Sequence, residues 1–208
     1  MAVALAVGAL LGGSASAQAP PLTANPAQGK IVSYTCLGCH GVQGYRNAAP
    51  NYAVPRLRGQ NVQYLVTALH EYKDGQRNHP TMRMQASSLS DQQMLDAVTY
   101  LAGDPLTAAT TPASSHPMPQ AAAVCTSCHG KDGIAIAPMY PNLAGQHASY
   151  IVRALREYQK LERKNPIMDS MAHSLTQGQE EAIAAYFSSF KPGLKTVPRP
   201  LTALSLPH

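Results

Sequence analysis

Two short stretches of this 208-residue chain carry the residue types of a covalent cofactor site. They read Cys-Leu-Gly-Cys-His at 36–40 and, 89 positions later, Cys-Thr-Ser-Cys-His at 125–129. Two cysteines three apart on a turn that continues into a helix present both sulfurs on one side, where they can bond the two vinyl groups of one haem. The histidine that follows can then ligate the iron, which makes Cys-x-x-Cys-His the attachment pattern for c-type haem. The pattern predicts two covalently held haem groups.

The alternative for each cysteine pair is a thioredoxin-like redox disulfide. Such a site needs no histidine, yet histidine follows both pairs, and the two motifs use every cysteine of the chain. We therefore expect two haem c. The expected haem-binding residues are the cysteines Cys36, Cys39, Cys125 and Cys128, together with His40 and His129 as proximal iron ligands.

Residues 1–17 resemble a secretory signal peptide. An apolar run over 2–11 precedes a small-residue site at 15–17, which predicts cleavage before Gln18. An uncleaved anchor is the alternative, because no Lys or Arg precedes the run, but the run is well short of the roughly 20 apolar residues that span a bilayer. We expect an exported protein of the periplasm.

The formal net charge is +5. Four haem propionates and two ferric porphyrin cores would bring the charge of the oxidised protein to about +3, so the excess of Lys and Arg argues little for nucleic acid as a partner. Positive charge is concentrated in 18–103 and after Phe190. This distribution suits docking to acidic redox proteins and is compatible with peripheral association with membrane complexes, although an ordinary solvated surface has the same composition.

The second half of the chain repeats the first. The offset is 89 at the cysteine motifs and 86 from Pro55 and Pro141 onward, which implies a three-residue deletion in a loop. Pairs at the second offset include Gln60 and Gln146, Tyr64 and Tyr150, Arg77 and Arg163, Met82 and Met168, and Tyr100 and Tyr186. We expect a first domain over 18–103, a linker rich in Pro, Thr, Ala and Ser over 104–117, a second domain over 118–191 and an extended Pro-rich tail over 192–208. Each domain is small enough that a haem would complete its core.

The caps and apolar spacing place helices in each repeat. In the first domain we expect helices at 27–34, 62–75 and 91–102, with a loop over 76–89. Ser90 with Gln93, and Thr176 with Gln179, have the spacing of a capping box at the last helix of each domain.

The repeat also suggests the second axial ligand of each iron. Met82 lies 42 residues after His40 and Met168 lies 39 after His129, each in Pro-x-Met. A thioether opposite a histidine favours ferrous iron and raises the reduction potential. Met84 and Met171 are rivals, but neither has a methionine partner in the other repeat. Simple packing is the alternative for all four, and His79 lies close enough in sequence for ligand exchange with Met82.

A proximal histidine usually donates its other ring N–H to a carbonyl or carboxylate. Pro50 and Pro138, ten and nine residues after the two histidines, are the candidate carbonyls. Four polar residues at the start of the middle helices are candidates for contact with a propionate, with ordinary helix-entry roles as the alternative. They are Gln60, Tyr64, Gln146 and Tyr150.

Together these features resemble the dihaem cytochrome c4 family over about residues 27–190. The resemblance rests on the paired Cys-x-x-Cys-His motifs, the Pro-x-Leu-x-Gly-Gln stretches and the methionines before Leu-Ser or Leu-Thr. It implies an all-α fold of two tandem class I cytochrome c domains, each wrapped around one covalently attached haem, which face each other across a pseudo-twofold axis. It also implies electron transfer from a quinol-oxidising complex toward a haem-copper terminal oxidase.

The leading hypothesis is therefore a non-enzymatic periplasmic carrier of single electrons in a respiratory chain. The alternative is the dihaem subunit of a dehydrogenase complex such as flavocytochrome c sulfide dehydrogenase, with a flavoprotein subunit as partner. A third hypothesis, a dihaem peroxidase or thiosulfate-oxidising enzyme, needs a substrate-accessible iron or an unusual ligand, which two equivalent methionines argue against.

Overall fold

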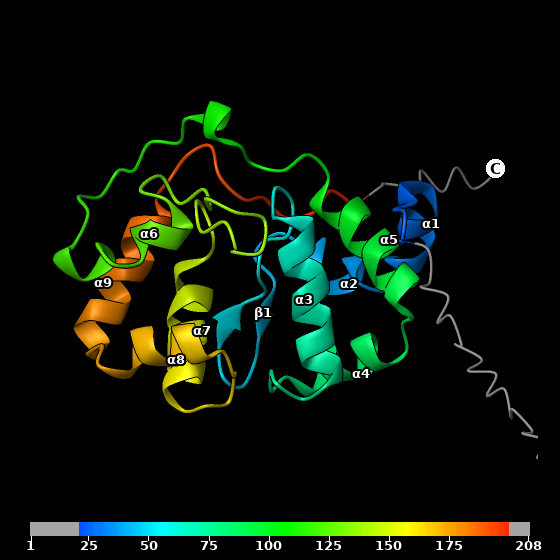
Figure 1. The fold of residues 1–208 in the computed structure, drawn as a ribbon, viewed down its shortest axis with the longest axis horizontal. Helices are drawn as coiled ribbons and strands as arrows, with labels where there is room; N and C mark the ends of the chain where they lie inside the picture. The colour runs from blue at the N-terminus through cyan, green and yellow to red at the C-terminus, as the bar shows by residue number, and fades with distance from the viewer. Residues whose placement is uncertain (1–20, 200–208) are drawn as a thin grey trace, which may run out of the picture.

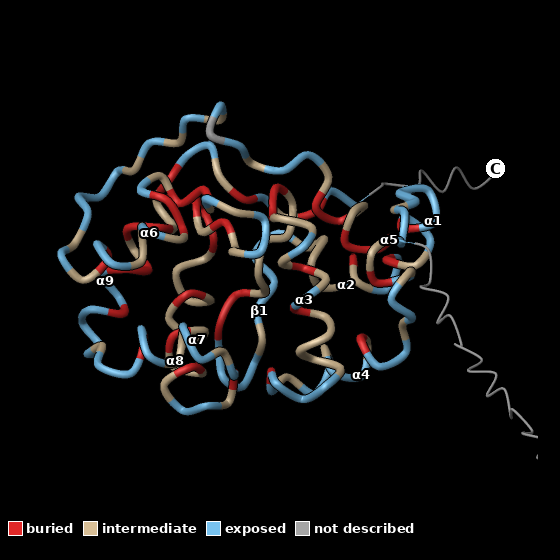
Figure 2. Tube along the Cα trace, viewed as in Figure 1, coloured by how far each residue is buried: buried red, intermediate tan, exposed pale blue. Residues whose placement is uncertain are grey.

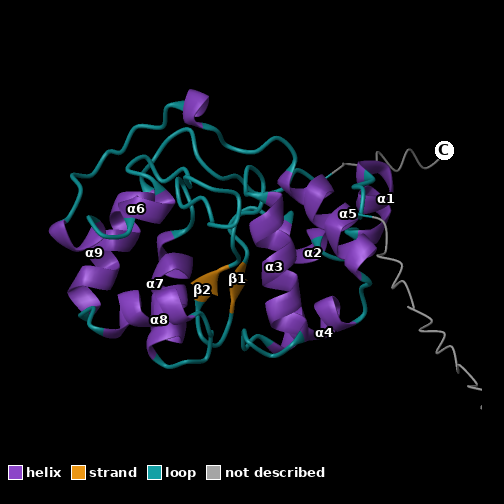
Figure 3. Ribbon diagram, in the orientation of Figure 1, coloured by secondary structure: helices purple, strands orange, loops and turns teal. Residues whose placement is uncertain are grey.

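The computed structural model of the protein describes residues 21–199, so the expected signal segment 1–17 lies outside the described residues. Two groups of helices lie side by side (Figure 1). Within the described range they are α1 (Pro26–Val32), α2 (Leu37–His40), α3 (Val62–Lys73), α4 (Pro80–Ser87) and α5 (Asp91–Ala102), then α6 (Thr126–His129), α7 (Ala148–Gln159), α8 (Pro166–His173) and α9 (Gln177–Ser188). A short antiparallel pair, β1 (Arg46–Asn47) and β2 (Tyr52–Ala53), lies between the groups (Figure 3). The expected predominantly helical, two-part fold is confirmed.

The longer helices begin where the sequence predicts. Both capping boxes form: the Ser90 side chain accepts from the Gln93 backbone N–H and the Gln93 side chain accepts from Ser90, and Thr176 and Gln179 make the same exchange. Asn25 caps α1 by accepting from the backbone of Gln28. These side chains satisfy N–H groups that have no partner inside the helix.

The expected loop over 76–89 is wrong, because it contains α4. Pro80 occupies the first turn, and the His79 ring caps the helix by accepting from the Met82 backbone N–H. Proline is favoured at this position, where its missing N–H would have no partner in any case. Eight residues are too few for a clear apolar period, and Pro80 by itself favours a loop as much as a helix start.

The helices next to the cysteine motifs are shorter than expected. α1 ends at Val32, and before the second motif the chain forms only a single 3-10 turn, η2 (Gln120–Ala122). α1 crosses α5 at close range: a Cβ on Gly29 would lie 2.0 Å from the carbonyl oxygen of Asp96. Only glycine allows two helix backbones to approach this closely.

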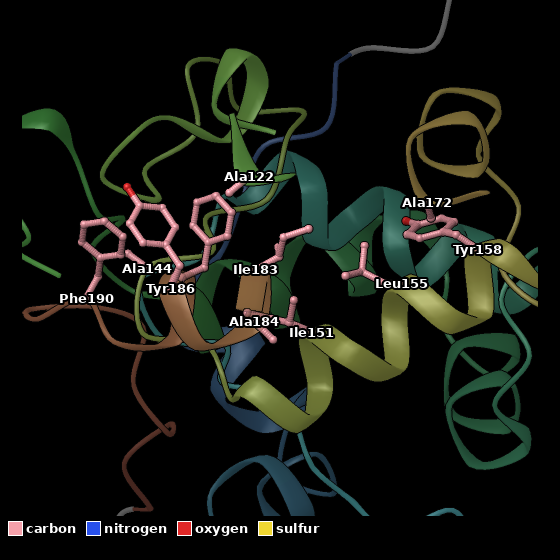
Figure 4. Close-up of a cluster of buried hydrophobic side chains, with 11 residues drawn as sticks. Ala122, Ala144, Ile151, Leu155, Tyr158, Ala172, Ile183, Ala184, Tyr186 and Phe190 are labelled. Carbon is pink, nitrogen blue, oxygen red and sulfur yellow. The ribbon is translucent and has the colours of Figure 1, made fainter. Parts of the chain in front are cut away.

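The apolar core differs between the two halves; Figure 2 marks the buried residues of both in red. In the second domain eleven buried residues form one cluster that includes Ile183, Tyr186, Phe187 and Phe190 (Figure 4). The first domain has two smaller clusters, one around Leu65 and Val98 and the other of Leu37, Leu101 and Val197. Val197 comes from the C-terminal segment, so the tail contributes to the core of the first domain.

Two connections run between the halves along one side of the molecule (Figure 1). The segment 104–117 contains a 3-10 turn, η1 (Ala108–Thr110), and exchanges backbone hydrogen bonds of 3.0 Å with the end of the second domain, Ala113 with Lys191. The segment after Lys191 then returns to the first domain. Among residues 21–199 no helix has both the length and the hydropathy that crossing a bilayer requires.

Candidate haem sites

The two cysteine motifs form matching short helices, and a proline carbonyl orients each histidine. His40 Nδ1 lies 3.0 Å from the carbonyl oxygen of Pro55, and His129 Nδ1 lies 2.9 Å from that of Pro141. The expected carbonyls, Pro50 and Pro138, are therefore wrong. Pro55 and Pro141 begin the two Pro-x-Leu-x-Gly-Gln stretches, and their register equivalence is the signal that could have found them.

This hydrogen bond fixes the tautomer of each histidine. Burial lowers the pKa of both rings, against the opposing effect of the proline carbonyl, so each imidazole is neutral at neutral pH. Because Nδ1–H donates to the carbonyl, Nε2 keeps its lone pair. A neutral imidazole held by a backbone carbonyl is the form that binds iron.

The two methionines occupy equivalent places in α4 and α8. Met82 and Met168 are each the third residue of their helix, and each is half-buried. The rivals Met84 and Met171 are more exposed, at 71% and 40%. Burial thus favours the register-matched pair. Met168 also packs against the core cluster of its own domain.

His79, the expected competitor of Met82, has partners for both ring nitrogens. Its Nδ1 accepts from the Met82 backbone N–H at 3.3 Å, and its Nε2 lies 3.3 Å from Asn47 Oδ1. Both contacts are compatible with one neutral tautomer. Exchange with Met82 would cost the cap of α4.

The side chains of Gln60 and Gln146 join the two domains. The Gln60 side chain accepts from Asn142 N at 2.7 Å and donates to Asn142 O at 3.0 Å. The Gln146 side chain makes the same pair of bonds with Arg56, at 2.9 and 3.0 Å. Arg56 and Asn142 are themselves register equivalents. The contact is therefore made twice by symmetry, and the oxygen and one N–H of each amide are engaged with the opposite domain. The contact of these glutamines with a propionate stays a prediction.

A buried basic cluster lies between the domains. Arg77 and Arg163, each 4% exposed, pair through an isolated antiparallel β-bridge, and both guanidinium groups reach the Tyr64 hydroxyl, at 3.4 and 3.0 Å. Burial alone would raise the pKa of Tyr64, but the two guanidinium charges lower it to about 8. The site is strongly positive.

The two arginines differ in their acidic partners. Arg77 forms an ion pair with Glu71, whereas Arg163 makes none of the ion pairs found among the described residues, and its buried Nε has no hydrogen-bond partner. A buried guanidinium without a counter-charge is costly. An anion brought by a cofactor would satisfy it, and a haem carries two carboxylates.

The residues present thus fit haem in three respects. The cysteines are partly accessible at the motif helices, the histidines keep a free Nε2, and Arg163 offers an unpaired cation for a propionate. When bound, a haem supplies an iron that takes up and releases one electron between its ferric and ferrous states. The cysteine pair and the oriented histidine, present twice in a helical repeat, define a dihaem c-type cytochrome.

Comparison with known proteins agrees. The model of the cytochrome c family matches this chain twice, over 26–103 and 120–191. Cytochrome c4 of Pseudomonas aeruginosa is 33% identical over 77% of this chain and 86% of its own length. The thiosulfate dehydrogenase electron acceptor of Stutzerimonas stutzeri is 30% identical over 80% of this chain and 81% of its own.

A solved structure shares the arrangement. Cytochrome c4 of Acidithiobacillus ferrooxidans superposes with a TM-score of 0.60 at 29% identity, covering 76% of this chain and 99% of that one. The chain belongs to the cytochrome c family and, as a tandem protein with two haem c groups, to its dihaem cytochrome c4 branch. It is an electron-transfer cytochrome.

Proposed function

We propose that this protein is a periplasmic carrier of single electrons in which both irons are six-coordinate, His40 with Met82 and His129 with Met168. The observation that carries the proposal is the equivalence of the two sites: each has a neutral histidine oriented by a proline carbonyl and a half-buried methionine at the third position of the following short helix. Six-coordinate iron reorganises little on electron transfer and leaves no position for a substrate.

The proposed donor is a quinol-oxidising complex and the proposed acceptor a haem-copper terminal oxidase, with cytochrome c4 relatives as support. The experiment has two parts. The reduced protein should not bind carbon monoxide, and it should pass two electrons per chain, one per haem, to a purified haem-copper oxidase. Carbon monoxide binding at either haem of the unmodified protein would contradict the carrier proposal at that site.

A second candidate is an electron acceptor for a thiosulfate-oxidising dehydrogenase, which the relative named as such an acceptor supports. It shares the two haems and differs only in the donor. Rapid mixing of the oxidised protein with a thiosulfate dehydrogenase and thiosulfate distinguishes the two: fast reduction of both haems favours this donor, whereas reduction only by the quinol-oxidising complex favours the first. A flavoprotein partner would co-purify with the protein and carry flavin.

A further inference from the structure

The C-terminal strap, which we define as residues 193–199, leaves the second domain and ends on the first (Figure 1). It begins beside the Gly-Gln stretch of the second domain, where Leu194 N donates to Ala144 O at 2.7 Å. Leu194 is buried, and a Cβ on Gly145 would lie 3.0 Å from Gly193 Cα. The origin of the strap is therefore packed tightly against its own domain.

The strap next pairs with the equivalent stretch of the first domain. Lys195 N donates to Arg58 O at 3.0 Å, and Arg58 N donates to Lys195 O at 3.1 Å. Arg58 and Ala144 occupy the same register position in the two repeats. Two consecutive residues of the strap, Leu194 and Lys195, thus bond the Gly-Gln stretches of the second and the first domain. These bonds fix the path of the strap across the interface.

It ends on the first haem-attachment helix. Val197 N donates to the carbonyl oxygen of His40 at 3.2 Å, and the Val197 side chain, 2% exposed, packs between Leu37 of α2 and Leu101 of α5. The side chain of Arg199 covers Gly41, where an added Cβ would lie 2.6 Å from Arg199 Cγ. A segment that follows the second domain therefore covers the backbone of the first attachment helix.

The strap makes no contact with the second attachment helix among the described residues; there the cover comes from the helix's own domain, where Ile136 N donates to Cys128 O at 3.1 Å. Leu37 lies between the cysteines of the first motif, and its counterpart Thr126 is half-exposed and hydrogen-bonds back to Ala123 O. Leu101 corresponds to Phe187, a larger side chain that is fully buried within its own domain. The first motif thus has an apolar residue, Leu37, where the strap packs. The second motif, which the strap does not contact, has the polar Thr126 at the same position.

We propose that the strap is a positioning element for the first haem: Val197 holds the His40 backbone and keeps water from α2, so that the second domain helps to set the properties of the first haem. The inference rests on the proposed ligation of the first haem by His40. The second haem is the internal reference, since the described part of the strap does not contact its motif. Water at the attachment helix would favour the charged ferric core and lower the reduction potential.

The test compares V197D with P198D in the full-length holoprotein. Both place one carboxylate at neighbouring positions, but Val197 is buried whereas Pro198 is exposed. Potentiometric titration should show the first haem shifted to lower potential in V197D and the second unchanged, with both unchanged in P198D. The wave that is displaced in Met82→Ala identifies the first haem.

Hydrogen exchange gives a second readout that does not depend on the haem potentials. The Val197 and Gly41 amides should exchange about tenfold faster or more in V197A, while the amides of α6 keep their protection. If V197D does not fold, the potentiometric titration and the hydrogen exchange of V197A test the proposal in its place. Equal shifts at both haems, or none at either with unaltered exchange, would overturn the proposal. Carbon monoxide binding by the unmodified protein would instead contradict the proposed function and leave the exchange result standing.

Discussion

The two domains share their ligand-bearing elements but complete their cores differently. In the first, α1 crosses α5 at Gly29 and the strap adds Val197 beside Leu101. In the second, a single 3-10 turn precedes the motif, and aromatic side chains of α9 and the residues just after it fill the core. The residues of the candidate haem sites occupy equivalent positions in the two repeats, whereas the residues that complete each apolar core differ.

This difference indicates which part of the repeat is constrained by chemistry. The histidine, its proline carbonyl and the interface glutamine recur at equivalent positions, because each must meet a group of fixed geometry. The proposed methionine ligands recur with them. Apolar volume can be supplied by any nearby segment, so a tail residue in one domain can serve where an aromatic residue serves in the other.

The largest effect is expected from G29A. The added Cβ would meet backbone atoms of Asp96 at 2.0 and 2.6 Å, and backbone cannot move aside as a flexible side chain can. We expect the first domain to lose about 3 kcal/mol of unfolding free energy. Thermal denaturation followed at each haem is the measurement.

G178A is the matched control in the second domain, because nothing lies within 4 Å of its added Cβ. It should stabilise α9 slightly, by less than about 1 kcal/mol, since alanine is the better helix former. Equal losses in the two variants would contradict the close α1–α5 crossing.

The interface glutamines test the symmetry of the contact. Gln60→Ala and Gln146→Ala each leave a backbone N–H and a carbonyl of the opposite domain without their partner. We expect each to lower the unfolding free energy by about 2 kcal/mol. Denaturant unfolding of the two single variants and the double variant provides the measurement, and a large effect from only one of the two would show that the contact is not symmetric in energy.

The buried arginine pair sharpens the comparison further, because Arg77 has an acidic partner and Arg163 makes none of the ion pairs found among the described residues. If Arg163 pairs with a propionate, R163M should lower the reduction potential of the nearby haem by removing a positive charge. R163K keeps the charge and should recover most of the shift. Potentiometric titration is the measurement, and an unchanged potential in R163M would mean that the guanidinium does not face the haem.

His147 should give the smallest effect. Burial, with the charges of Arg56 and Arg46, lowers its pKa from 6.5 to about 4. Between these values the unfolded chain binds more protons than the folded one, so stability falls as the pH drops from about 6.5 toward 4. H147N installs the residue found at the equivalent position, Asn61, and should flatten this part of the stability profile. A profile unchanged from the parent protein would contradict the assignment.

Much of the haem chemistry is readable from the sequence because it depends on local spacing. Cys-x-x-Cys-His spans only about one helical turn. The repeat alone favours Met82 over Met84 as the ligand, because only Met82 has a methionine, Met168, at the equivalent position. The capping boxes are equally local, and both formed as predicted.

The errors at the haem sites concern contacts between distant segments. The carbonyls of Pro55 and Pro141 reach the histidines across a loop. The bonds of the glutamines to the opposite domain could not be predicted for the same reason. The extended tail was predicted, but its contact with α2 depends on how the two domains pack. No spacing in the sequence encodes that arrangement.

The most direct test of the central claim, one His–Met haem in each domain, is the sulfur-to-iron charge-transfer absorption of the oxidised protein in ligand variants. Met82→Ala and Met168→Ala should each remove about half of the band, because one of two iron–sulfur bonds is lost, and each should admit carbon monoxide to one reduced haem. Met84→Leu and Met171→Leu, at the exposed rival positions, should leave the band intact. A full band in Met82→Ala, or a band lost in Met84→Leu, would contradict the assignment.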